Sequence, residues 1–160
     1  MANLSNLFLR TALLFLGTGV AMGIFMSLSQ DFTIRPVHVH VNLLGWVGFF
    51  LYALFYRHFP HVAATRLPWI HFWTAVIGLP AMMAGLTLVV FGYMSLGLPL
   101  LLGGELVTVI SVALFIHIGF TATKAEPASA HRESFAPAEG SDRRLLRNDE
   151  AQTQMPRRYG

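Results

Sequence analysis

Residues 35–56, RPVHVHVNLLGWVGFFLYALFY, decide the fold of this chain and carry its most distinctive polar side chains. After Arg35 the stretch has no formal charge as far as Tyr56, and about twenty apolar residues are enough for a helix to cross a bilayer. Pro36 stands where the first residue of a helix is expected, a position at which its missing N–H costs nothing. The pattern therefore predicts a transmembrane helix over residues 37–56.

The composition of the whole chain supports a membrane protein. Of its 160 residues 54% are hydrophobic and only 12% are charged, whereas about a quarter of the residues of an average soluble domain are charged. The chain has no cysteine, so disulfides, thiolate metal ligands and cysteine nucleophiles are excluded. Any metal must be held by histidine, methionine or carboxylate side chains.

Three further apolar segments, residues 11–29, 68–93 and 97–122, are each long enough to span a bilayer. The first is longer than a signal-peptide core and lacks a small-x-small cleavage site, so we expect it to be retained. Residues 125–160 are rich in Pro, Ala, Ser, Glu and Arg and cannot bury enough apolar surface to fold. We predict an all-α fold: an integral membrane four-helix bundle over residues 1–124, followed by a disordered cytoplasmic tail over 125–160.

The distribution of charge points to membrane topology, with no nucleic-acid partner. The tail after Lys124 carries six arginines against six acidic residues, so the net charge of +3 belongs to the apolar part. Arg10, Arg57, Arg66 and Lys124 flank one side of the predicted spans, whereas Arg35 alone flanks the other. Because cytoplasmic loops are enriched in Lys and Arg, we predict a multi-pass protein with both termini in the cytoplasm.

His38, His40 and Asn42 lie in the first turns of the second predicted span. Polar side chains at membrane depth are costly and usually functional. Residues two apart on an α-helix differ by about 200° around its axis, so His38 and His40 are expected to serve different partners. Imidazole suits iron, copper and zinc, and without cysteine we favour haem iron or copper. Hydrogen bonding to water and headgroups at the interface is the alternative.

His71 and His117 form a second candidate pair, because a hairpin of the third and fourth spans can bring them face to face. Histidines on facing helices often hold a six-coordinate haem, although a helix-to-helix hydrogen bond is the favoured alternative. Glu105 is expected at a depth from which it reaches the region below His40. It is a candidate for orienting a ligand histidine from behind or for carrying protons.

Other polar and small residues have simpler interpretations. Gly19 and Gly23 form a small-xxx-small pair that allows another helix to approach closely. Met22 and Met26 share one helix face, where gap filling is favoured over iron or copper ligation. His58 and His61 fall in the basic loop over residues 57–66 and are interpreted as solvated or interfacial.

The run from Arg35 to Trp46 resembles the histidine-bearing helices of haem-copper oxidase subunit I, a family that includes cytochrome c oxidase and nitric oxide reductase. His40-Val-Asn-Leu-Leu is similar to a motif that opens a haem-ligand helix of the nitric oxide reductase large subunit. His38-Val-His40 is similar to the His-x-His that serves two haems in that superfamily. His71-Phe-Trp resembles a helix start seen there, with less specificity.

This resemblance implies that His40 is an axial ligand of a low-spin b-type haem, and that His38 binds a second haem or a metal such as copper. It covers chiefly the second span, and the histidine cluster that holds the oxidase copper has no counterpart. A homo-oligomer can supply a missing ligand if two copies of His40 sandwich one haem across a two-fold axis. We expect the glycine face of the first helix to make that contact.

The sequence thus leads to a haem-binding protein of the bacterial inner (plasma) membrane that takes part in respiratory electron transfer. If it is an enzyme, it is expected to be an oxidoreductase of the cytochrome c oxidase or nitric oxide reductase type. The alternative is a non-enzymatic accessory, assembly or sensor subunit of a respiratory complex, or one that handles copper or haem. A third interpretation is a purely structural helix bundle with interfacial histidines.

Overall fold

The computed structural model describes residues 3–124, and all of its regular elements are helices. In chain order they are α1 (Leu4–Ser29), α2 (Arg35–His40), η1 (Val41–Gly48), α3 (Phe49–His58), α4 (Pro60–Ala63), α5 (Leu67–Val90) and α6 (Met94–Lys124). The predicted all-α fold is therefore confirmed. The tail predicted over residues 125–160 lies outside the described residues.

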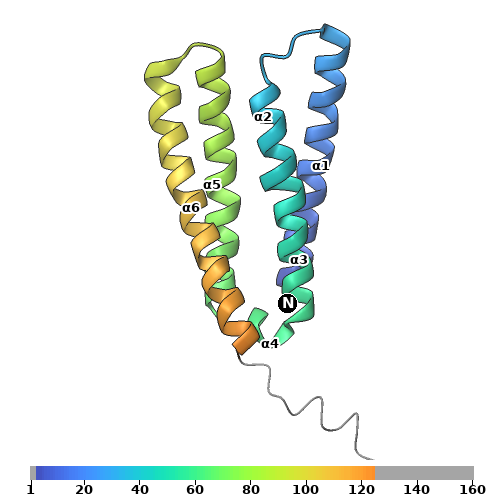
Figure 1. The fold of residues 1–160 in the computed structure, drawn as a ribbon, viewed down its shortest axis with the longest axis vertical. Coiled ribbons are helices and arrows are strands. Elements are labelled where there is room, and N and C mark those ends of the chain that lie inside the picture. The colour runs from blue at the N-terminus through green and yellow to red at the C-terminus, as the bar shows by residue number, and fades with distance from the viewer. Residues whose placement is uncertain (1–2, 125–160) are drawn as a thin grey trace, which may run out of the picture. The chain divides into compact units, whose positions relative to one another are not determined.

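Four helical segments are long and apolar enough to cross a membrane: α1, the continuous run from Arg35 to His58, α5 and α6. They form two hairpins, α1 with the run from α2 to α3 and α5 with α6, and the short α4 joins the hairpins (Figure 1). The four predicted spans are all present, with ends that differ by up to seven residues. The multi-pass architecture expected from the sequence is thus consistent with the fold.

The largest difference in boundaries lies at the start of α1. The span was predicted to begin at Thr11 because Arg10 is charged, yet the helix begins at Leu4, where the side chain of Asn3 accepts a hydrogen bond from the N–H of Ser5. The added turns bury Leu4 and Phe8 completely or nearly so. The Ser5 hydroxyl also donates to the carbonyl of Ala53 on α3 at 2.9 Å. These turns are thus held by packing on α3, which a count of apolar residues does not detect.

The second span contains a feature that the sequence did not predict. Between α2 and α3 the backbone is π-helical for eight residues, Val41–Gly48. Helical segments with i→i+5 hydrogen bonds are rare, and those that exist are often found at functional sites. Gly45 allows close packing here, because a Cβ atom at this position would lie 2.6 Å from Cγ of Phe15 on α1.

Aromatic rings fill the region where the two hairpins meet. Phe8 lies at its centre, with ring centroids 5.4 Å from Tyr56, 5.2 Å from His71 and 5.0 Å from Phe72. Phe115 of α6 closes the cluster, 4.5 Å from Tyr52. Because these rings come from α1, α3, α5 and α6, the cluster ties both hairpins together.

Candidate functional site

The helix that carries His38, Asn42 and His40 presents them to two different neighbours. His38 and Asn42 face α1: a Cβ atom on Gly23 would lie 3.3 Å from Cε1 of His38, and one on Gly19 would lie 2.5 Å from Oδ1 of Asn42. This confirms that Gly19 and Gly23 admit a close helix neighbour. That neighbour is the chain's own second span, so the glycine face is already covered and is not available to a second copy, contrary to our expectation.

Asn42 is held by its hydrogen bonds to the preceding turn. Its amide nitrogen donates to the carbonyl oxygen of His38 at 2.8 Å and lies 3.4 Å from Nδ1 of the same residue. Nδ1 of His38 therefore faces a donor within the chain. The imidazole of His38 is half-buried against α1. It packs over Gly23 and lies beside the amide of Asn42.

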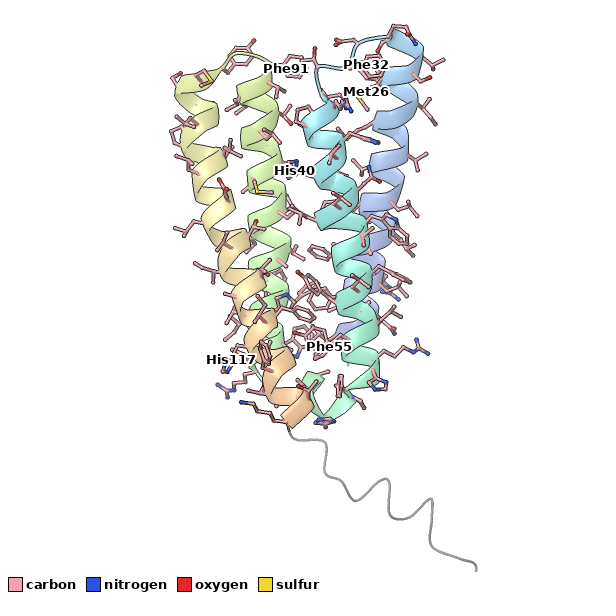
Figure 2. The ribbon with its side chains drawn as sticks, viewed as in Figure 1. Met26, Phe32, His40, Phe55, Phe91 and His117 are labelled. Carbon is pink, nitrogen blue, oxygen red and sulfur yellow. The ribbon has the colours of Figure 1, made fainter. Side chains whose placement is uncertain are left out.

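His40 has the opposite environment. Its side chain is exposed and points toward the hairpin of α5 and α6 (Figure 2). Its Nδ1–H donates to the carbonyl oxygen of Pro36 at 2.8 Å. Because a neutral imidazole carries one proton, this bond leaves the lone pair on Nε2. Fixing one ring nitrogen on a carbonyl is how proteins orient a histidine that binds a metal through the other.

His40 and Glu105 line the same groove, although they lie on different hairpins. The groove has a volume of about 250 Å³, and its other lining residues are Leu44, Met82, Thr108, Val109 and Val112. The depth estimated from the sequence thus agrees with the structure, which brings Glu105 to the His40 side of the second span. Four of the lining side chains are aliphatic or thioether groups, so the groove is apolar with one imidazole and one carboxyl.

The structure does not bring His71 and His117 together. His71 is fully buried, and its Nδ1 accepts a hydrogen bond from the Tyr56 hydroxyl at 2.9 Å. Its ring packs 4.6 Å from Tyr52 and 5.4 Å from Phe115. His117 is exposed on the outer side of α6 (Figure 2). A hydrogen bond between helices was the favoured alternative for His71, and it exists, but with Tyr56 as the partner.

His71 therefore belongs to the aromatic cluster and has no access to a ligand. Its Nε2 is the one buried side-chain polar atom without a hydrogen-bond partner in the described part of the chain. Rings surround it, which is why no protein group satisfies it. Tyr56, which positions this imidazole, was not singled out from the sequence, because a tyrosine at the end of an apolar span is ordinarily an interfacial anchor.

The remaining candidates lie apart from the groove. Met26 is buried at the far end of α1, whereas Met22 is half-buried. His58 is the last residue of α3 and His61 lies in α4, and both side chains are exposed.

Within residues 3–124 no group of three or more His, Cys, Asp or Glu side chains is arranged to hold a metal ion. A bare-ion site of that kind is therefore not formed by the described part of one chain. In comparisons with known proteins, no family model, no curated protein and no solved structure matches this chain.

Proposed function

We propose that this protein binds a b-type haem in the membrane through His40 and takes part in electron transfer. The observation that carries the proposal is the hydrogen bond from Nδ1–H of His40 to the carbonyl of Pro36, which leaves Nε2 exposed with its lone pair. The sequence around His40, which is similar to the haem-ligand helix of the haem-copper oxidases, supports the same ligand.

Haem is favoured over a bare metal ion by the number of ligands that the chain must provide. The porphyrin occupies four positions of the iron, so one or two histidines complete its coordination. A copper or zinc ion held only by protein needs about three or four donors, and no cluster of three His, Cys, Asp or Glu side chains occurs in residues 3–124. A single oriented imidazole is sufficient for haem, whereas a bare ion in this groove would also require Glu105 and the thioether of Met82 as ligands.

Most residues of the groove have a definite role in this proposal. His40 would hold the iron of a bound haem through Nε2, and the apolar side chains of Leu44, Val109 and Val112 would line the macrocycle. Glu105 lies in the same groove, and because both nitrogens of the His40 imidazole are engaged, we assign it the role of a proton carrier. The bound haem supplies one-electron transfer.

A second histidine for the haem would come from another protein chain. His38 faces α1 and so does not share the groove of His40. His40 is exposed, and a second copy related by a two-fold axis would bring an identical imidazole to the other face of the haem. This homo-oligomer uses the side of α2 that faces the groove. Subunits of a respiratory complex are the alternative source of the ligand.

A variant series tests this assignment with a control on the same protein. Purified apoprotein in detergent is titrated with haemin, and the Soret band is followed in wild type, His40→Ala and His117→Ala. We expect His40→Ala to lose the low-spin spectrum and His117→Ala to keep it, because both side chains are exposed but only His40 is oriented by a carbonyl. Equal spectra in all three proteins would refute the assignment. Copper bound through His40 without haem would favour the copper-handling alternative.

A further inference from the structure

A second cavity lies at the other end of the helices, where the chain crosses from one hairpin to the next. It is an open cavity with a volume of about 440 Å³, bordered by the start of α1, the end of α3, α4 and the first turn of α5. Its lining residues are Asn3, Leu4, Tyr56, Arg57, Pro60, Ala63, Ala64 and Trp69. None of them belongs to the groove of His40, so this is a separate site.

Arg57 is the charged residue of this cavity, and no carboxylate of the described chain lies near it. Within residues 3–124 the acidic residues are Asp31 and Glu105. Asp31 lies in the turn between α1 and α2, at the opposite end of the hairpins, and Glu105 lines the groove of His40 (Figure 1). Arg57 is exposed at the cavity, so its guanidinium is available to a ligand, and the planar arrangement of its N–H donors matches the oxygens of a phosphate.

Two other features of the wall suit an anion at the membrane surface. Leu4 is the first residue of α1, a helix of 26 residues with no acidic residue in its first turn. The positive end of its dipole thus lies at the cavity, where the neutral side chain of Asn3 caps the N–H of Ser5 and no acidic residue of the first turn offsets the dipole. Trp69 is half-buried in the wall, and tryptophan is enriched at the level of lipid headgroups.

We propose that this cavity binds the phosphate of an anionic membrane phospholipid. The cavity lies at the ends of membrane-spanning helices, which is the level at which a headgroup meets the protein. Arg57 binds the phosphate oxygens, the start of α1 adds favourable potential, and Trp69 packs against the glycerol region. The proposal is independent of haem binding, since the two sites share no residue.

Native mass spectrometry of the full chain in detergent tests the proposal. The protein is titrated with phosphatidylglycerol, and with diacylglycerol as the probe that lacks phosphate. We expect one tightly bound phosphatidylglycerol and no comparable adduct of diacylglycerol. Arg57→Gln should weaken the first adduct about tenfold, the loss expected for one charge-assisted contact. Arg66→Gln is the matched control: it removes one positive charge at the same end of the helix bundle, but Arg66 does not line the cavity. This variant should keep the adduct.

A second variant and a second probe distinguish a formed site from general attraction to basic helix ends. Ala64→Trp fills the cavity without a change of charge and should also displace the lipid, while circular dichroism confirms that the helices persist. Inorganic phosphate that competes with the lipid shows that the anion alone is recognised, and failure to compete shows that the lipid chains contribute. Equal loss in Arg57→Gln and Arg66→Gln, or equal binding of diacylglycerol, would overturn the proposal.

Discussion

Two adjacent glycines of α6 should respond in opposite directions to the same substitution. Gly104 is buried against α5: a Cβ atom at this position would lie 2.6 Å from Cα of Met82 and 2.8 Å from the carbonyl carbon of Ala81. Gly103 has no atom within 4 Å of the corresponding position. The new methyl of Gly104→Ala would meet backbone atoms, which cannot rotate away as a side chain does.

The size of the effect follows from the distance by which the helices must separate. An ordinary contact requires about 3.4 Å, so clearing Cα of Met82 alone requires about 0.8 Å, and the backbone nitrogen of Met82 lies closer still. The helices α5 and α6 must therefore move apart by at least this distance, enough to forfeit a quarter to a half of the dispersion energy at neighbouring contacts. One such contact is at Gly78, where a Cβ atom would be 2.9 Å from the N–H nitrogen of Thr108. Overpacking of this kind costs about 1–3 kcal/mol. Gly103→Ala should instead stabilise the helix by about 0.5–1 kcal/mol.

The two variants are compared by unfolding in mixed micelles with increasing SDS, with helicity followed by circular dichroism. Gly104→Ala is expected to unfold at lower SDS than wild type, and Gly103→Ala at equal or higher SDS. Because the residues are neighbours with the same change in propensity, the difference isolates the packing of α6 on α5. Indistinguishable midpoints for the two variants would refute this packing.

Two further predictions concern polar groups. Tyr56→Phe removes the hydrogen bond to His71 and should lower the free energy of unfolding by about 1 kcal/mol, which is within the range for hydrogen bonds between membrane helices. Unfolding in SDS measures this effect, and an unchanged midpoint would contradict the prediction. The hydroxyl and the N–H of Thr33 donate hydrogen bonds to the carboxylate of Asp31 and hold its pKa below the ordinary value. The ionised carboxylate therefore stabilises the folded state above about pH 4. This contribution is lost as the pH falls through the pKa of the folded state. The unfolding midpoint of Asp31→Asn should therefore lie below that of wild type at neutral pH and converge with it at low pH.

The length of the apolar runs and the positions of the charges were sufficient to predict the helices, because each span is a long and predominantly apolar segment. The opposed directions of His38 and His40 also followed from helical spacing alone. Packing of Gly19 and Gly23 against another helix was predicted as well. What the pattern did not determine was which helix would fill that space, since a small face accepts any neighbour.

The features missed by the sequence depend on contacts between distant residues. The π-helical segment Val41–Gly48 has no local residue signature, and the close packing of Gly45 against Phe15 involves a residue of another helix. His71 was a candidate haem ligand as one of a pair with His117, and a hydrogen bond between helices was the favoured alternative. Its enclosure by rings from three other helices, and its bond to Tyr56, come from the tertiary fold.

The central claim is that this protein binds haem through His40, and one absorption spectrum tests it most directly. The full chain is purified in detergent after expression with a haem precursor, and spectra are recorded before and after reduction with dithionite, with metal analysis of the same sample. The account predicts iron in the sample and a Soret band that sharpens and shifts on reduction. A flat visible spectrum without iron, from folded protein supplied with haem, would contradict it.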